Sequence, residues 1–388
     1  MNYLVIGDAG SMHIYNFVKT FLLPKRYTIF LLTLSSYPVR NNYREFYREH
    51  NITVYSIAEQ NYYGTGRTDK LFRLLNLCRK FRLWKKIPKM DICHVHSVYK
   101  TSIAMVLRNR NKFKRLILSY WGGDIENKNS SVIRLREKCF AYADVISVTV
   151  KQTYLDFQKI YGHKYDDKLL ISRFATEGLE QIKILSKETT KEECRDFYHI
   201  PKEKICLTCG YSAYADQHQD DCLKELMKLP KLIREKIYVI VPMQYGRFDE
   251  GYIKRVEDQA KLCDFSCMIL KKYTSFENSA KLAIATDIYI HVRDTDAFSN
   301  TLKEQVYASS LIITGSWLSY LELEEMGVPL TRINGIGELS KTVEKIIPHF
   351  IPEKTIHLYE PIYEMYSTES IVTQWETVLE KALHEETS

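Results

Sequence analysis

The sequence predicts an α/β protein made of two tandem Rossmann-like domains that face each other across a cleft. Three observations point to this fold class. Short apolar segments alternate with helical ones along most of the chain, as in parallel sheets covered by helices on both faces. The alternation breaks once, in a charged stretch, and then starts again. The chain has 388 residues, which is too long for one ordinary core and suits two domains.

The first domain, expected over residues 1–183, opens with an apolar strand that runs into the small-residue turn of NYLVIGDAG. SMHIYNFVKTFLL then has helical spacing, so the chain begins with a β-turn-α unit. Further strands are predicted at 27–34, 52–57, 90–97, 115–123, 144–150 and 169–176. Helical segments such as KTSIAMVLRNR and VKQTYLDFQKIYG follow them, which predicts a parallel sheet.

Residues 177–204 are charged and contain no clear strand, so we place the connection between the domains there. A second alternating series follows, for a domain expected over 184–365. Its strands are predicted at 205–211, 237–244, 265–272, 287–294 and 311–315. Its helices are predicted at 222–233, 252–263, 279–285 and 302–309. The pattern indicates a second parallel sheet.

The composition excludes several classes of protein. With 45% hydrophobic and 27% charged residues, the chain reads as soluble and globular rather than disordered or fibrous. It has no apolar run of roughly eighteen residues and no signal peptide, so we expect neither a membrane span nor secretion. The nine cysteines are scattered, which favours a cytoplasmic location. Cys206 and Cys209 have C-x-x-C spacing but lie within a predicted strand, so we expect buried structural thiols.

The charge is distributed unevenly. The net charge is +7, yet residues 1–115 hold 21 Lys and Arg against 6 Asp and Glu, so the remainder is acidic. The segment 67–89 carries nine basic residues against one acid, with its leucines on one side of a helix. We expect it to lie on an anionic membrane surface; a core-packed helix with a solvated basic face is the alternative. No nucleic-acid recognition motif accompanies this charge, so no nucleic acid is expected as a partner.

Ligands of open α/β sheets bind at the loops that follow the carboxyl ends of strands. No such loop carries G-x-G-x-x-G, which argues against a nicotinamide or flavin enzyme. The stretch DTDAFSNTLKEQVYASSLIITGSW predicts a loop and then a helix, with Ser299, Asn300 or Thr301 as its cap. The free N–H groups of its first turn suit a diphosphate, Glu304 could accept from ribose hydroxyls, and Asp296 could hold a hydroxyl of the transferred group. Alternatively, Asp296 ends a turn and Glu304 is a solvated helix residue.

The segment DAFSNTLKEQVYASSLIITGSWLSY resembles the donor-binding motif of retaining GT-B glycosyltransferases, in which two acidic residues are separated by seven others. Further segments resemble that group in the same order along most of the chain: GSMHIYNF, DICHVHS, YWGGDI and ADVISVTV. YSTESIVTQWETVLEKAL resembles the C-terminal helix that returns to the first domain in this fold, which defines a third segment, 366–388.

The resemblance implies roles for particular residues. The donor would be bound by Gly10, Ser11, Gly210, Arg247, Lys272, Arg293, Ser299, Asn300, Thr301 and Glu304. Asp124, His96 and Asp296 would be the catalytic residues, and His13 and Trp121 would bind the acceptor. Such enzymes need no side-chain nucleophile, because the leaving diphosphate itself takes the acceptor's proton. We expect no metal and no cofactor besides a UDP- or TDP-sugar as substrate.

Some of these residues have a simpler interpretation. Gly10 could be an ordinary turn glycine, His13 a residue of a helix face, and Trp121 a packing residue under its loop. His94 and His96 alternate along a strand, so we expect at most one of them to face the cleft.

The motif also departs from the family. Asp296 stands where Glu is usual, and the loop GYSAYADQHQDD lacks the Arg and Lys with which many relatives bind the diphosphate. Arg247, Lys272 or Arg293 would have to meet that charge. The loop, together with VPMQYGRFDEGYIKRV, is similar to enzymes that transfer an acetamido-dideoxy sugar from a TDP donor to a lipid-linked acceptor.

The sequence therefore predicts a retaining hexosyl- or acetamidohexosyltransferase. Its partners would be a nucleotide sugar and a lipid-linked or oligosaccharide acceptor in surface polysaccharide biosynthesis. We expect a cytoplasmic protein attached peripherally to the inner face of the cell membrane through residues 67–89. Two alternatives stay open: a sugar-nucleotide epimerase, and a catalytically silent GT-B subunit that activates a partner.

Overall fold

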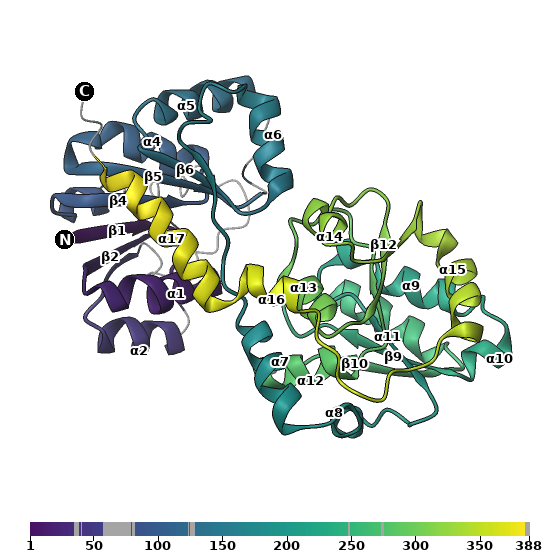
Figure 1. Ribbon diagram of the computed structural model, residues 1–388. Helices are drawn as coiled ribbons and strands as arrows, with labels where there is room; N and C mark the ends of the chain where they lie inside the picture. The colour runs from purple at the N-terminus through teal and green to yellow at the C-terminus, as the bar shows by residue number, and fades with distance from the viewer. Residues whose placement is uncertain are drawn as a thin grey trace. The chain divides into compact units, whose positions relative to one another are not determined.

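The computed structural model describes residues 1–34, 39, 41–56, 79, 82–122, 124, 129–246, 249–272 and 275–384. The chain forms two compact units, each with its own parallel sheet (Figure 1). The first comprises Met1–Ala175 and Thr368–Ser388, and the second comprises Thr176–Ser367. The predicted α/β class with two Rossmann-like domains is confirmed.

In the described residues the first unit has a seven-stranded sheet in the order β3-β2-β1-β4-β5-β6-β7, with every pair parallel. The strands are β1 Asn2–Ile6, β2 Thr28–Thr33, β3 Thr53–Ser56, β4 Met90–His96, β5 Phe113–Tyr120, β6 Val145–Val148 and β7 Leu169–Ile171. The central strands are almost fully buried, as expected for parallel strands with helices on both faces. All seven coincide with strands predicted from the sequence.

The C-terminal helix belongs to the first unit, where Figure 1 shows it in yellow against the purple and blue strands and helices. The unit's helices are α1 Met12–Phe17, α2 Asn41–Glu49, α4 Lys100–Arg108, α5 Ser130–Phe140, α6 Lys151–Tyr161 and α17 Thr368–Leu383. Trp375 of α17 is buried, and its ring centroid lies 4.8 Å from that of Phe17. Its indole Nε1 donates to the carbonyl oxygen of Arg173 at 2.9 Å. The helix therefore completes the core of the first unit.

The second unit has a six-stranded parallel sheet within the described chain, in the order β10-β9-β8-β11-β12-β13. Its strands are β8 Ile205–Cys209, β9 Ile237–Pro242, β10 Ser266–Leu270, β11 Ile288–His291, β12 Leu311–Gly315 and β13 Leu330–Ile333. Its helices are α7 Glu177–Glu188, α8 Lys191–Phe197, α9 Gln219–Leu226, α10 Lys231–Arg234, α11 Glu250–Lys261, α12 Phe276–Ala285, α13 Asn300–Tyr307, α14 Leu321–Glu325, α15 Leu339–Ile346 and α16 Glu360–Tyr366. The chain order reverses at β8 and β11, which places a topological switch point between these central strands.

The connection expected at 177–204 is helical and belongs to the second unit. α7 packs against α12 and α13, so the chain enters this unit after Ala175 rather than at 183/184. It leaves the unit after Ser367 rather than at 365/366. α8 begins with a capping box in which Glu193 accepts from the backbone N–H of Thr190 at 2.7 Å. β13 has no counterpart among the predicted strands, because Pro329 and Arg332 interrupt its apolar pattern.

Much of the basic segment predicted to meet a membrane, residues 67–78, 80 and 81, lies outside the described residues. Residues 82–86 are helical, and Trp84 is buried in the core of the first unit. This end of the segment therefore agrees with the core-packed alternative. In the described part of the chain no helix combines the length and the apolar character needed to cross a membrane. Cys206 and Cys209 are buried free thiols, and burial raises the pKa of Cys206 to about 12.

Candidate functional site

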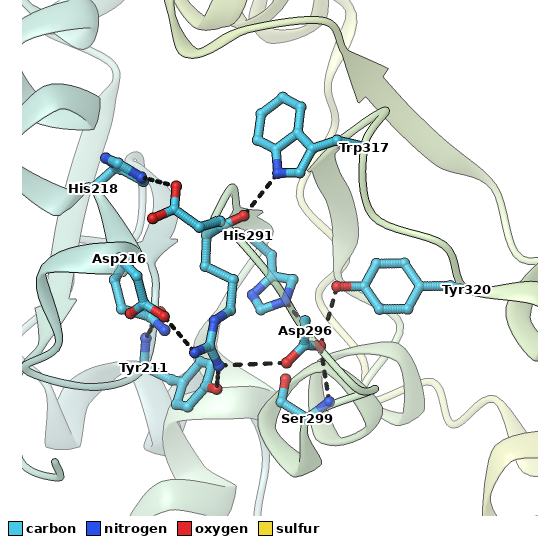
Figure 2. A network of polar contacts seen from close by, with 11 residues as sticks. Tyr211, Asp216, His218, His291, Asp296, Ser299, Trp317 and Tyr320 are labelled. Carbon is cyan, nitrogen blue, oxygen red and sulfur yellow. Dashed lines mark hydrogen bonds and ion pairs between the residues drawn. The ribbon is translucent and has the colours of Figure 1, made fainter. Parts of the chain in front are cut away.

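Polar side chains gather at the carboxyl ends of β8, β11 and β12 in the second unit (Figure 2). β8 and β11 pair directly, so the loops that follow them leave the sheet side by side. Tyr211 follows β8, Arg293 follows β11, and Trp317 follows β12. This is the edge, next to the switch point, at which open α/β sheets bind ligands.

Arg293 places a positive charge at the carboxyl edge of the second sheet. Its Nη2 donates to Asp216 Oδ2 at 2.6 Å, and its Nη1 donates to the hydroxyl of Tyr211 and faces Asp296 Oδ1 at 3.5 Å. Trp317 fixes the backbone, because its Nε1 donates to the carbonyl oxygen of Arg293 at 2.8 Å. The guanidinium is thus held between two loops, while its Nε is buried without a partner in the described chain.

The side chain of Asp296 is almost fully buried, and its carboxylate has four partners. Its Oδ2 lies 3.2 Å from His291 Nε2 and accepts from the Tyr320 hydroxyl at 3.1 Å and the Ser299 N–H at 2.9 Å. Burial alone would raise the pKa of Asp296, but the hydrogen bonds from His291 and Ser299 and the charge of Arg293 outweigh it and lower the pKa to about 2. Both oxygens are engaged within the protein, so Asp296 is an anion that holds the loop before α13 in place.

The start of α13 is strained and incompletely capped. Phe298, two residues before the helix, has a left-handed backbone with φ 64, which costs a non-glycine residue roughly 1–2 kcal/mol. Packing of its ring against Tyr320 and Tyr366, at centroid distances of 5.8 and 5.5 Å, holds it there. Ser299 is the N-cap, yet its hydroxyl oxygen is buried and unpartnered within the described chain. The first N–H groups of α13 therefore have no side-chain cap and can receive an anion.

Glu304 lies one turn inside α13 and is 8% exposed. Its carboxylate forms no hydrogen bond with the described residues. Burial raises the pKa of Glu304 to about 7, while the nearby charge of Lys303 acts in the opposite direction. Asn300, the first residue of α13, accepts from Thr176 Oγ1 at 3.2 Å, and Thr301 beside it is half-buried. A buried carboxylate without donors from the protein is suited to hydroxyl groups of a ligand.

The other predicted donor residues are more dispersed. Gly210 has φ 65 directly after β8, and a Cβ there would lie 2.9 Å from Gln217 Oε1, so this turn needs glycine. Lys272 is exposed after β10, the edge strand, and β9 and β8 separate that strand from β11, which Arg293 follows. Arg247 lies outside the described residues. Of the three basic residues expected to meet the phosphate charge, only Arg293 is seen at the switch point.

In the first unit, His94 and His96 lie on the same face of β4, with ring centroids 4.0 Å apart. The premise that the two side chains alternate between the faces of the strand is wrong, because residues two apart in a strand point the same way. The ring nitrogens of His94 lie 2.8 Å from the Tyr3 hydroxyl and 2.7 Å from Ser119 Oγ. Both nitrogens of His96 are buried with no partner in the described chain. Burial, with a smaller contribution from His13, lowers the pKa of His96 to about 3, so this ring is neutral.

Trp121 packs against His96 at the carboxyl ends of β4 and β5, and His13 of α1 packs against Trp121. The His13 and Trp121 ring centroids are 5.3 Å apart, and Trp121 lies 5.8 Å from His96 and 5.0 Å from Phe174. The indole nitrogen of Trp121 is buried and unpartnered among the described residues. The structure thus brings three predicted residues of the first unit into one aromatic cluster.

Asp124, predicted as catalytic, is buried and holds two loops together. Its carboxylate accepts from the backbone N–H groups of Val98, Trp121 and Gly122 at 2.7, 2.9 and 3.1 Å. Burial raises the pKa of Asp124, and these hydrogen bonds oppose the rise. Because the carboxylate joins the loop after β5 to the loop after β4, its geometry fits a positioning residue.

Gly10 and Ser11 lie in the loop between β1 and α1. The Gly10 N–H donates to Asp8 Oδ1 at 2.9 Å, and Ser11 Oγ accepts from the His13 N–H at 3.2 Å as the N-cap of α1. Both residues therefore have a local structural role, and Ser11 fixes the start of α1, the helix that carries His13.

Tyr211, Asp216, His291 and Tyr320 contact Arg293 or Asp296 but are not among the predicted site residues. The only signals for them in the sequence are positions: His291 ends a strand before the acidic loop, and Tyr211 follows Gly210. Among the described residues no cluster of His, Cys, Asp and Glu could hold a metal ion.

Comparisons of the sequence and of the structure show which known proteins this chain is similar to. Residues 3–149 match the family model described as Glycosyl transferase 4-like. HepE from Anabaena, solved in complex with UDP and glucose, is similar with a TM-score of 0.67 and 13% identity, over 98% of this chain and 99% of that chain. Sucrose-phosphate synthase from Thermosynechococcus elongatus is similar with a TM-score of 0.71 and 12% identity, over 98% of each chain. The chain has the GT-B fold.

A trehalose-phosphate synthase from Burkholderia xenovorans has the GT-B fold as well, with a TM-score of 0.63 and 9% identity over 98% of this chain and 99% of that chain. No curated protein sequence matches the chain. The predicted resemblance is thus confirmed for the GT-B fold, and residues 3–149 of the first unit carry the family match. A retaining mechanism, and the binding of the donor by two acidic residues that seven others separate in the motif, stay predictions.

Proposed function

We propose that this GT-B protein is a glycosyltransferase that binds a nucleotide-diphosphate sugar at the carboxyl edge of its second sheet. The observation that carries the proposal is a group of buried polar atoms that lack partners in the described chain. Arg293 Nε, Ser299 Oγ and Gln217 Nε2 all lie in the loops after β8 and β11, and the carboxylate of Glu304 forms no hydrogen bond with the described residues. Buried polar groups are normally paired, so these atoms are arranged for a ligand.

The protein would bind the donor at two places. Arg293 and the uncapped start of α13 would bind the diphosphate, through the guanidinium charge and free N–H groups. Glu304 would accept from the ribose hydroxyls. Arg293 would then take over the role of the Arg and Lys that are missing from the loop after β8. A UDP- or TDP-sugar is the proposed donor, and the similarity to a fold solved with UDP and glucose supports it.

The reaction would proceed on one face of the sugar, with retention. The acceptor hydroxyl oxygen would form a bond to the anomeric carbon of the donor sugar while the bond between that carbon and the diphosphate oxygen breaks. The proton of the acceptor hydroxyl would pass to the leaving diphosphate oxygen. Arg293 and the α13 N–H groups would stabilise the charge that develops there. His96, which is neutral, would hold a hydroxyl of the sugar or acceptor.

The acceptor side of the proposal is a lipid-linked saccharide in surface polysaccharide assembly. The excess of basic residues in the first part of the chain, including 67–89, supports attachment to an anionic membrane surface. Sedimentation with anionic liposomes tests this point. A sugar-nucleotide epimerase would stay in solution and would convert its donor without any acceptor.

One observation favours a second candidate, a catalytically silent GT-B subunit. Both oxygens of Asp296 are occupied within the protein, and Arg293 is flanked by Asp216 as well as Asp296. A silent subunit would bind the nucleotide sugar without turning it over. NMR analysis of the product anomer, with donor and lipid-linked acceptors supplied together, distinguishes the transferase from the silent subunit. The transferase would form a glycosylated product, and the silent subunit would form none.

A thermal-shift panel of UDP-, TDP-, GDP- and CMP-sugars tests the proposed donor site. We expect a UDP- or TDP-sugar to raise the melting temperature, because a ligand that binds only the native state stabilises it. Glu304→Ala should reduce the shift, whereas Lys272→Met, at an exposed position after the edge strand, should leave it unchanged. The absence of any shift across the panel with the wild-type protein would overturn the proposal.

A further inference from the structure

Gly178 lies in the first turn of α7, against α13. A Cβ built on Gly178 would lie 2.1 Å from Oε1 of Glu304, 2.5 Å from its Cδ and 3.0 Å from its Cγ. Non-bonded atoms do not approach this closely. The carboxylate of Glu304 therefore occupies the space that any side chain at position 178 would need.

The backbone gives no reason for glycine at this position. Gly178 is inside a helix of twelve residues and is not among the glycines with positive φ. Glycine in a helix costs roughly 1 kcal/mol relative to alanine. The feature that excludes a side chain is Glu304 itself, because all three of the atoms nearest to the missing Cβ belong to it.

The two helices cannot easily separate to make room. Thr176 Oγ1, just before α7, donates to Asn300 Oδ1 at the start of α13 at 3.2 Å. Farther along α7, Glu180 Oε2 accepts from the Tyr363 hydroxyl of α16 at 2.6 Å. The backbone N–H of Tyr359, the N-cap of α16, donates to the carbonyl oxygen of Tyr307, the last residue of α13, at 2.9 Å. α13 is thus tied to both neighbouring helices, and a side chain at position 178 would move Glu304 rather than the helices.

We propose that Gly178 is a positioning residue of the donor site, whose missing side chain lets the Glu304 carboxylate rest against α7 where ribose hydroxyls can reach it. This inference rests on the proposed function. It adds a residue from outside the acidic motif, more than a hundred positions earlier in the chain. It also predicts that the site prefers a UDP-sugar to a TDP-sugar, since the ribose of UDP offers Glu304 a pair of neighbouring hydroxyls and the deoxyribose of TDP offers only one.

The test compares binding of UDP and 2′-deoxy-UDP by calorimetry. Gly178→Ala should weaken UDP binding about tenfold or more, the effect of a lost hydrogen bond to a charged group. The preference for UDP over 2′-deoxy-UDP should fall toward one, which a general loosening of the fold would not cause. The matched control is Gly337→Ala: a Cβ at that position meets nothing within 4 Å, so affinity should be unchanged.

A double-mutant cycle shows whether Gly178 acts through Glu304. With Glu304→Ala already in place, adding Gly178→Ala should change UDP affinity less than about twofold and should raise the melting temperature, because alanine favours the helix. If Gly178→Ala alone fails to fold, the double variant must fold again, since no carboxylate remains to overlap.

The outcomes separate the two proposals. If the wild-type protein binds neither UDP nor TDP, the proposed function fails and this inference fails with it. If it binds TDP as tightly as UDP, the proposed function stands and only the inference is overturned, because the deoxyribose of TDP lacks the hydroxyl pair. If the wild type binds UDP and Gly178→Ala binds it equally well, with the same preference over 2′-deoxy-UDP, only the role of Gly178 is overturned.

Discussion

The rings of His94 and His96 lie 4.0 Å apart on one face of β4, and their hydrogen-bonding states are opposite. His94 has a hydroxyl partner for each ring nitrogen, from Tyr3 and Ser119. His96 has none among the described residues, although both of its nitrogens are buried. An unpaired buried polar group costs stability. The unpaired ring of His96 beside Trp121 therefore indicates a role other than stabilising the fold.

Phenylalanine substitutions should separate the two histidines. His94→Phe leaves the buried Tyr3 hydroxyl without its histidine partner, while Ser119 keeps its hydrogen bond to Ser147 at 2.7 Å, and should lower the free energy of unfolding by about 1–3 kcal/mol. His96→Phe breaks no hydrogen bond, so stability should be kept while sugar transfer falls about tenfold or more. Urea unfolding and turnover assays on both variants measure this. Equal destabilisation by the two substitutions would contradict it.

Asp296 should stabilise the protein chiefly through its charge. Its folded pKa of about 2 lies below the ordinary value of 3.8, so its contribution is present above pH 3.8 and is lost as the pH falls toward 2. The shift corresponds to about 2 kcal/mol. We expect Asp296→Asn to lose about this much stability at pH 7 and almost none at pH 2, as measured by urea unfolding across pH. A constant deficit at every pH would show that the amide disturbs the loop in some other way.

Glu304 should have the opposite dependence on pH. Its folded pKa of about 7 lies above the ordinary value of 4.5, so stability is full below pH 4.5 and decreases by about 3 kcal/mol as the pH rises through 7. Lys303 on the same helix and Tyr289 on β11 are the described titratable groups that interact with it. Glu304→Gln should remove this slope. Affinity for UDP should rise over the same range, because the ionised carboxylate accepts hydroxyls better, and a flat profile in the wild type would contradict the burial of this acid.

Apolar patterning predicts most of the fold. Twelve predicted strands occur in the structure, because parallel strands buried on both faces are almost uniformly apolar. β13 escapes prediction, because it is short and Arg332 lies inside it. The charged stretch 177–204 hides α7 and α8, whose exposed faces carry the charges. The shift of the domain boundary follows from the same error, since α7 packs within the second unit.

The sequence could locate residues of the candidate site along the chain, but it could not predict their contacts. Glu304 and Ser299 could be assigned because spacing along a single loop and helix fixes where they lie. The partners of Asp296 and Arg293 could not: Tyr320 lies 24 residues beyond Asp296, and Tyr211 lies 82 residues before Arg293. Only the folded sheet brings these residues together, and their contacts change the role expected for Asp296 from holding a ligand hydroxyl to holding a loop.

Asp287 offers a prediction at the other end of β11, away from the site. Its buried carboxylate lies 2.9 Å from Lys191 Nζ and 2.8 Å from Arg195 Nη1, both on α8, and accepts from the Cys206 N–H at 2.8 Å. Asp287→Asn leaves two buried cations without their counter-charge, which should cost about 3–5 kcal/mol in unfolding free energy.

The affinity for UDP should nevertheless survive Asp287→Asn under conditions where the variant is folded, because Asp287 precedes β11 whereas Arg293 follows it. Asp258→Asn is a suitable control: this carboxylate pairs with Lys261 on the surface of α11, where solvent screens the charges, so stability should be unchanged. Urea unfolding and calorimetry on both variants measure the two effects. A loss of UDP affinity that exceeds the loss expected from unfolded protein would mean that the buried ion pairs at the start of β11 also set the position of Arg293 at its end.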